Sequence, residues 1–365
     1  MKDERKEMRA VLFSTNNEIL EMLDNPKLAE EKVNIVGLCD RDTSLWGEEK
    51  NGQRIISPFE MLKLYRNKEL DKIILPGATK NELERRKMFF LINGLGIAEE
   101  DILFGTVELF HKSSQGPYFL KWKELRYFDY LELHTCDHCN LKCHNCNNFA
   151  NYVEGERYYE YDTFFKDSER LKKLISHISL IRVLGGEPLL NPDTYKYIKR
   201  LRELYPYAEI TMVTNGILLP NASEILWQTI RETNAMVDLT AYPILYDKID
   251  ERIALLNSKK VRHRNPFIAS KFFPPIIERY EYPLSYVDCM CVNLRDGYLT
   301  RCPMQQYIAD YNKANGTEFD VLAGKINIYQ IESFEKLINR LHKPFELCNY
   351  CGMWRQNELW EKWEM

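Results

Sequence analysis

Three cysteines stand close together in the stretch CNLKCHNC, residues 139–146. Three residues separate Cys139 from Cys143, and two separate Cys143 from Cys146. Three thiolates can hold three corners of a four-iron cube and leave its fourth iron open to another ligand. The spacing therefore favours a 4Fe–4S cluster on this loop, with Cys139, Cys143 and Cys146 as its ligands.

Zinc is the alternative for this loop, because cysteine-rich knuckles commonly hold it. A structural zinc site usually has four ligands, and the loop offers only three cysteines in close succession. Cys136, His138 or His144 would have to supply the fourth ligand.

A second stretch that can bind a ligand is IRVLGGEPLL, residues 181–190. Gly185 and Gly186 permit close approach of a ligand to the backbone. Glu187, followed by Pro188, can accept a charge-assisted hydrogen bond from an ammonium group. Small polar side chains also follow the next two predicted strands: Thr214, Asn215 and Thr240.

A second group of cysteines lies near the C-terminus. Cys291, Gly297 and Cys302 form a C-x5-G-x4-C pattern, in which a turn glycine lets a hairpin bring both thiols together. The pair Cys348 and Cys351 completes four ligands. By itself this set would favour zinc.

Cys289 is left over by this assignment. It can replace Cys291 as a ligand, be buried and inert, or point into the active site as a hydrogen donor. In the last case Cys289 is the candidate catalytic residue.

Repeated strand and helix patterns must position these residues. Strands are predicted near 127–135, 179–184, 209–214 and 236–241, and helices near 162–176, 193–204 and 222–233. Repeated β/α units suggest a partial barrel of the TIM type, whose catalytic groups lie at the C-terminal ends of the strands. The cysteine loop and the GGE stretch both follow predicted strands directly.

The first third of the chain has its own α/β pattern. Short apolar runs at 9–14, 33–38 and 71–76 predict parallel strands, with helices between them at 17–25, 58–65 and 81–94. This alternation predicts a Rossmann-like, doubly wound domain. Asp40 ends the second strand, but the first runs into STNNE instead of G-x-G-x-x-G, so we do not expect NAD to bind.

The predicted fold class is therefore α/β throughout. We expect a Rossmann-like domain at 1–115, a partial (β/α)6 barrel at 120–280 and a small C-terminal iron–sulfur segment at 281–365. The turn-rich SSQGPY at 113–118 is the predicted linker.

Composition and charge exclude several classes of function. Hydrophobic residues make up 45% of the 365 residues, which is enough for packed cores. A net charge of −4 gives no general attraction to nucleic acid or to an anionic membrane. The N-terminus has no apolar secretory signal and no stretch is long enough to span a bilayer, so we expect a cytoplasmic protein. In a reducing compartment, clustered cysteines indicate metal binding or catalysis.

The cysteine triplet followed by GGEP resembles the radical S-adenosylmethionine (radical SAM) enzymes. The resemblance implies that the amino and carboxylate groups of SAM chelate the open iron, and that reduction of the cluster splits SAM into methionine and a 5′-deoxyadenosyl radical. It implies that Gly185, Gly186 and Glu187 hold the methionine end of SAM. Side chains implied near the ribose or the substrate are Thr214, Asn215 and Thr240.

The chain differs from the family's usual pattern at one position, and two further stretches of it resemble known domains. The family usually has an aromatic residue beside the adenine just before the third cysteine, where this chain has Asn145. The C-terminal cysteines resemble the auxiliary-cluster (twitch or SPASM-like) segment of some members, which implies a second 4Fe–4S cluster. Through IVGLCDRD and WGEEKNGQRIISPFEM, the N-terminal domain resembles small nucleotide-fold domains of surface-polysaccharide and sugar-nucleotide enzymes; the alternative for it is a docking role.

These resemblances imply an enzyme that abstracts hydrogen from a carbohydrate or sugar nucleotide, with dehydrogenation favoured over epimerisation. An external electron donor such as flavodoxin or ferredoxin would reduce the cluster. The alternatives are a peptide- or protein-modifying radical SAM enzyme, and a non-catalytic iron–sulfur or zinc scaffold.

Overall fold

The structure is a computed structural model that describes residues 7–76, 82–105, 118–281, 289 and 291–365. It divides into two compact units, Met1–Asp129 and Tyr130–Met365. Most of the predicted linker at 113–118 lies outside the described residues. In the described part of the chain, no helix is long and apolar enough to cross a membrane.

The first unit is a twisted α/β sheet with the strand order β3-β4-β2-β1-β5-β6-β7. Its central strands pair in parallel, as the alternating pattern predicts. Its strands are β1 (Met8–Phe13), β2 (Val33–Cys39), β3 (Glu49–Lys50), β4 (Gln53–Ile56), β5 (Lys72–Pro76), β6 (Ile102–Gly105) and β7 (Phe119–Lys121). Its helices are α1 (Asn17–Leu23), α2 (Pro26–Glu30), α3 (Pro58–Arg66) and α4 (Glu82–Gly94).

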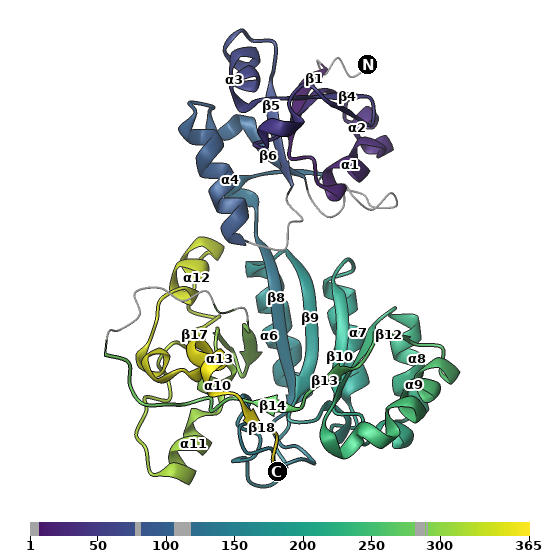
Figure 1. Ribbon diagram of the computed structural model, residues 1–365, viewed down its shortest axis with the longest axis vertical. Coiled ribbons are helices and arrows are strands. Elements are labelled where there is room, and N and C mark those ends of the chain that lie inside the picture. Colours follow the sequence, from purple (N-terminus) through teal and green to yellow (C-terminus); the bar gives the residue numbers. More distant parts are fainter. Residues whose placement is uncertain (1–6, 77–81, 106–117, 282–288, 290) are drawn as a thin grey trace. The chain divides into compact units, whose positions relative to one another are not determined.

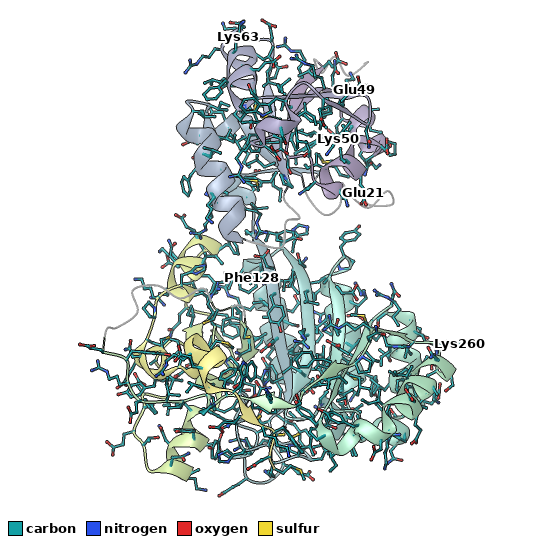
Figure 2. The ribbon with its side chains drawn as sticks, viewed as in Figure 1. Glu21, Glu49, Lys50, Lys63, Phe128 and Lys260 are labelled. Atoms are coloured by element: carbon teal, nitrogen blue, oxygen red, sulfur yellow. The ribbon has the colours of Figure 1, made fainter. Side chains whose placement is uncertain are left out.

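Both faces of this sheet are covered, because two separate hydrophobic clusters form from alternate residues of the same strands. Val11 and Phe13 of β1 belong to one cluster, and Ala10 and Leu12 belong to the other. Polar side chains such as Glu21 of α1 lie on the outer surface (Figure 2). The unit is therefore doubly wound, as predicted.

The carboxylate of Asp40, the residue after β2, accepts hydrogen bonds from other residues of the chain. One of its carboxylate oxygens accepts hydrogen bonds from the backbone N–H of Thr15 at 3.0 Å and from the Thr15 hydroxyl at 2.7 Å. The other oxygen accepts a bond from the N–H of Asp42 at 3.0 Å. Asp40 thus ties the loop after β1 to the loop after β2.

The second unit is built on a larger sheet with the order β12-β11-β10-β9-β8-β15-β16-β17 (Figure 1). Helices connect β8 to β9, β9 to β10, β10 to β11 and β11 to β12, which is the repeated β/α arrangement of a partial barrel. The strands are β8 (Tyr127–Cys136), β9 (His177–Gly185), β10 (Glu209–Thr214), β11 (Met236–Ala241), β12 (Arg262–His263) and β13 (Phe267–Ile268). The connecting helices are α6 (Tyr161–Leu174), α7 (Thr194–Leu204), α8 (Glu224–Glu232) and α9 (Ile249–Ser258).

The C-terminal segment joins this sheet through a hairpin. Strand β15 (Asn293–Arg295) pairs in parallel with β8 and antiparallel with β16 (Tyr298–Thr300). Asp296 and Gly297 turn the chain with φ angles of 46° and 77°, the left-handed conformation of a tight hairpin. The remaining elements are β14 (Lys271–Phe272), β17 (Ile326–Asn327), β18 (Glu361–Lys362), α10 (Pro303–Gln306), α11 (Ile308–Asn315), α12 (Phe334–Leu341) and α13 (Gln356–Leu359).

Candidate active site

The cysteine loop begins where β8 ends, and the end of β9 packs directly against it. The N–H of Gly186 donates to the carbonyl of Cys136 at 3.0 Å, and the N–H of Glu187 donates to the carbonyl of His138 at 3.1 Å. A Cβ at Gly185 would collide with the Cys136 carbonyl, and one at Gly186 would collide with that of His138. The glycines thus allow close approach of the cysteine loop to the strand end, a constraint that the sequence analysis assigned to a ligand alone.

Glu187 is buried at the centre of this junction, with 1% of its surface exposed. One carboxylate oxygen accepts hydrogen bonds from the Thr214 hydroxyl at 2.7 Å and the Leu189 N–H at 3.1 Å. The other accepts from the N–H of Asn215 at 2.9 Å. The carboxylate therefore ties the end of β9 to the end of β10 and orients two of the predicted SAM-site residues.

Burial raises the pKa of Glu187 to about 7, while its three hydrogen-bond donors act in the opposite direction. A carboxyl group whose pKa is raised by folding stabilises the protein fully below its unfolded pKa, and this contribution is lost as the pH rises through the folded value. Between about pH 5 and pH 8, the free energy of unfolding of the metal-free protein should therefore fall more steeply in the wild type than in Glu187→Gln. Urea denaturation at a series of pH values measures both slopes, and equal slopes would contradict the expectation.

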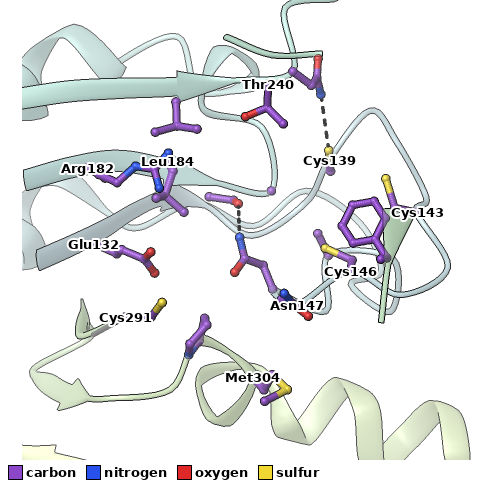
Figure 3. A pocket seen from close by; sticks show the side chains of 18 of the residues that line it. Glu132, Cys139, Cys143, Cys146, Asn147, Arg182, Leu184, Thr240, Cys291 and Met304 are labelled. Carbon is purple, nitrogen blue, oxygen red and sulfur yellow. Dashed lines mark hydrogen bonds between the residues drawn. The ribbon is translucent and has the colours of Figure 1, made fainter. Parts of the chain in front are cut away.

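The three loop cysteines line one cavity of about 400 Å³. Figure 3 shows Cys139, Cys143 and Cys146 along one side of it. Burial raises the pKa of the Cys139 thiol to about 12 and also raises that of Cys146, whereas backbone N–H groups of residues 148–151 lower the pKa of Cys146. These N–H groups donate toward sulfur, as an iron–sulfur cluster requires of its loop.

The same cavity brings together most of the predicted site residues. Besides the loop cysteines, its lining includes Gly185, Gly186, Glu187, Thr214, Asn215, Thr240, Cys289, Cys291, Cys302 and Cys351. Pro188, Asn145 and Cys348 lie outside this lining. Pro188 is buried in η4 (Pro188–Leu190), and its carbonyl accepts a bond from the Thr194 hydroxyl at 2.7 Å.

Of the three residues that could have completed a zinc site, His138 and Cys136 use their side chains in other contacts, whereas the contact of His144 is made by its backbone. Nδ1 of His138 accepts from the N–H of Arg157 at 3.1 Å, and the Cys136 thiol donates to the Glu187 carbonyl at 2.9 Å. The backbone N–H of His144 donates to the carbonyl of Glu364 at 2.9 Å. Over the described residues, no three His, Cys, Asp or Glu side chains are arranged around a single metal ion.

The last residues of the chain cover the cysteine loop, which the sequence analysis missed. Strand β18 pairs antiparallel with β14. The indole Nε1–H of Trp363 then donates to the sulfur of Cys143 at 3.2 Å, and the Asn145 amide donates to Glu361 at 2.7 Å. A tryptophan more than 200 positions from the loop carries no local signal of this contact.

Aromatic rings lie beside the loop even though Asn145 replaces the usual one. The ring of Tyr242 stacks on Phe272, with 5.9 Å between centroids, and on Trp363, also at 5.9 Å. Tyr242 and Phe272 line the cavity. The aromatic rings of the cavity therefore come from segments remote from position 145 in the chain.

The C-terminal cysteines divide into two environments. The Cys302 thiol is buried, and its pKa is raised by this burial and by the nearby thiols of Cys351, Cys289 and Cys348. Burial and the nearby Glu132 carboxylate together raise the pKa of Cys291 to about 12. Figure 3 shows the Cys291 sulfur pointing toward Glu132.

Comparison with known proteins agrees with this geometry. Residues 133–265 match the radical SAM superfamily. Curated relatives include a GTP 3′,8-cyclase of Staphylococcus carnosus, 31% identical over 113 residues, which are 30% of this chain and 33% of the relative. Another, from Clostridium acetobutylicum, is 35% identical over 28% of this chain and 32% of the relative. The chain thus spans about a third of the length of these relatives.

Among solved structures, BtrN in an open conformation aligns with 61% of this chain and 92% of its own, at 17% identity and a TM-score of 0.34. The stretch matched by the superfamily contains the three loop cysteines and the GGE strand end. Residues 133–265 therefore form a radical SAM domain.

Proposed function

We propose that this protein is a radical SAM enzyme that abstracts a hydrogen atom from a carbohydrate or sugar-nucleotide substrate. The observation that carries the proposal is one cavity with three parts: the cysteine loop, the GGE strand end and a polar wall that includes Glu132 and Arg182. A scaffold protein would need the cysteines but not the remaining parts.

The residues fit the cluster and the SAM that the superfamily implies. The Cys139, Cys143 and Cys146 thiols would hold three irons, with N–H donors directed at their sulfurs. When bound and reduced, the cluster and SAM supply the 5′-deoxyadenosyl radical. The chain's own contribution is to bind: the strand end at 185–187 would hold the methionine part of SAM, while Thr214, Asn215 and Thr240 would contact its ribose or the substrate.

The carbohydrate assignment draws on two features. At the polar wall, Arg182 donates to Asp238 at 3.1 Å and Glu132 lies beside them, so one guanidinium faces two carboxylates. A neutral polyhydroxy group suits such a wall better than a phosphate does. The N-terminal domain resembles domains of sugar-nucleotide enzymes and would bind a sugar nucleotide rather than NAD, because its first loop lacks the fingerprint glycines.

The C-terminal cysteines would hold a second 4Fe–4S cluster, and a flavodoxin or ferredoxin would deliver electrons. A closed auxiliary cluster could accept an electron from the substrate radical, which favours dehydrogenation. A thiol near the radical would instead return a hydrogen atom and give epimerisation.

The test is product analysis with anaerobically reconstituted protein, SAM and dithionite. We expect methionine and 5′-deoxyadenosine, with turnover increased by a sugar nucleotide. GTP belongs in the same screen, because the curated relatives are named GTP 3′,8-cyclase. A fully loaded protein that forms no 5′-deoxyadenosine with any candidate would favour the scaffold alternative, and stimulation by GTP alone would replace the carbohydrate substrate with a purine nucleotide.

A further prediction concerns Trp363, whose indole N–H reaches the sulfur of Cys143. Hydrogen bonds to ligand sulfurs stabilise the reduced, more negative cluster and raise its reduction potential. Trp363→Phe should therefore lower the potential of the loop cluster, as measured by a redox titration followed by electron paramagnetic resonance. Trp360→Phe is the matched control, because Trp360 is 45% exposed and packs edge-on against Phe273. An unchanged potential in Trp363→Phe would show that the bond has no influence on the cluster.

A further inference from the structure

The register between β15 and β8 decides where Cys291 lies. The backbone N–H of Glu132 donates to the carbonyl of Val292 at 2.7 Å, and Asn293 pairs with Glu132. Cys291, which precedes Val292, therefore lies beside the Glu132 side chain, on the barrel side of the cavity. Figure 3 shows Cys291 and Glu132 facing each other across this part of the cavity, with Arg182 beyond.

Cys289 lies next to the other C-terminal cysteines. Its carbonyl accepts a hydrogen bond from the Arg301 guanidinium, close to Cys302 in the chain. Cys289, Cys302 and Cys351 line the same cavity, and the Cys289 thiol raises the pKa of both Cys302 and Cys348. The thiols of Cys289, Cys302, Cys348 and Cys351 thus form one neighbourhood.

Glu132 lines the cavity, and the two oxygens of its carboxylate differ in their hydrogen bonding. It is only 6% exposed, and its Oε1 accepts from the Tyr130 hydroxyl at 2.6 Å. Its Oε2 has no donor at full hydrogen-bond geometry among the described residues: Nε2 of His134 lies 3.6 Å away, and the weakly donating Cys291 thiol points toward the carboxylate (Figure 3). A buried carboxylate oxygen without a donor is costly, so a ligand that donates to it gains binding free energy.

Arg182 supplies the complementary charge. Its guanidinium contacts Asp238 at 3.1 Å and the Tyr130 hydroxyl at 3.5 Å, and the side chain lines the cavity. A hydroxyl group can donate to Glu132 and accept from an arginine at the same time, whereas an ammonium group cannot accept and a carbonyl cannot donate.

We propose that Glu132, Arg182 and Cys291 form the substrate wall of the cavity, that this wall takes a hydroxyl-bearing carbon, and that Cys291 is its hydrogen donor. Cys289 then replaces Cys291 in the auxiliary set with Cys302, Cys348 and Cys351. The inference rests on the proposed function and reverses the roles that spacing gave to Cys289 and Cys291.

The 5′-deoxyadenosyl radical removes a hydrogen atom from the carbinol carbon and becomes 5′-deoxyadenosine. The Cys291 S–H bond then breaks and a C–H bond forms on the opposite face, which leaves a thiyl radical on sulfur. One electron from a reduced iron–sulfur or flavin donor and one proton from solvent restore the thiol. The product is the epimer of the substrate, so this placement of Cys291 favours epimerisation over dehydrogenation.

The first test measures metal content. Iron and zinc are counted in reconstituted Cys291→Ala and Cys289→Ala proteins. We expect Cys291→Ala to keep the full wild-type metal content and its spectrum, and Cys289→Ala to lose the metal of the auxiliary site. The opposite pattern, or equal losses, would overturn the assignment.

The second test needs no natural substrate. Holoenzyme equilibrated in D2O carries S–D at Cys291, so the 5′-deoxyadenosyl radical formed with SAM and dithionite should take deuterium from it. Mass spectrometry should find deuterated 5′-deoxyadenosine in the wild type and in Cys39→Ala, which removes a buried thiol of the first unit, and much less in Cys291→Ala. Deuterium that does not depend on Cys291 would refute the donor role, whereas a wild type that makes no 5′-deoxyadenosine would refute the proposed function itself.

The third test addresses the hydroxyl-bearing ligand, with UDP-glucose, UDP-N-acetylglucosamine and myo-inositol as calorimetric probes of the SAM-loaded holoenzyme. Glu132→Gln should weaken the best probe about tenfold or more, the scale of a hydrogen bond to a charged group. Glu209→Gln is the control, because Glu209 begins β10 and pairs with Arg262. Affinities unaffected by Glu132→Gln for every probe, or no binding of any probe, would overturn the hydroxyl assignment.

Discussion

Replacing Cys139, Cys143 and Cys146 together with alanine should remove about half of the iron, because we expect the reconstituted wild type to hold about eight irons in two cubes. The same variant should form no 5′-deoxyadenosine, because the open iron that would bind SAM is lost with its three ligands. Iron analysis and product chromatography measure the two effects on one preparation.

Cys39→Ala is the control for the loss of buried thiols, since Cys39 is buried in the first unit, within its own hydrophobic cluster. It should keep the wild-type iron content. A wild type with about four irons and zinc in place of the second cube would overturn the auxiliary cluster and leave the loop cluster intact. Full iron in the triple variant would refute the loop cluster itself.

Gly186→Ala should have the second large effect. Its Cβ would collide with the carbonyl of His138 and lie 2.7 Å from that of Asp137, and neither backbone atom can move without displacing the cysteine loop. Overpacking against rigid backbone should cost about 3 kcal/mol or more of stability. The variant should therefore unfold at lower denaturant concentration and retain little iron.

Gly94→Ala is the matched control, because no atom lies within 4 Å of the added Cβ and the residue ends α4 of the first unit. Its stability should equal or slightly exceed that of the wild type, since alanine is the better helix former. If Gly186→Ala kept wild-type iron and stability, the close packing between the strand end and the loop would be refuted.

Local pattern was enough to predict most of the longer strands and helices between residues 9 and 241, but it gave none of those that follow. The apolar runs that we expected at 209–214 and 236–241 are β10 and β11 with those bounds, and the helix expected at 193–204 is α7 at 194–204. Each of these elements has a pattern of buried and exposed residues that is visible in the order of neighbouring residues in the sequence. The cysteine triplet and GGE are also local, because one loop and one strand end hold all their members.

The rest of the site depends on contacts between distant parts of the chain. Trp363 reaches Cys143 only because β18 pairs with β14, and Cys291 faces Glu132 only because β15 pairs with β8 in one register. A shift of one residue in that pairing would send the side chains of β15 to the other face of the sheet. Sequence spacing allowed either Cys289 or Cys291 as the fourth ligand, and our proposal that it is Cys289 draws on the pairing of the strands, which turns Cys291 toward Glu132 (Figure 3).

By itself, then, the sequence determined the chemistry that the loop can support. The three thiols lie within eight consecutive residues and the glycine–glycine–glutamate motif within three, so each motif is present in any fold of the chain. The tertiary structure alone decided which side chains surround that chemistry. Glu132 and Arg182 lie on β8 and β9, and Tyr242 and Trp363 directly follow β11 and β18. Their approach to the cysteines follows from strand order and register, which no local stretch of sequence encodes.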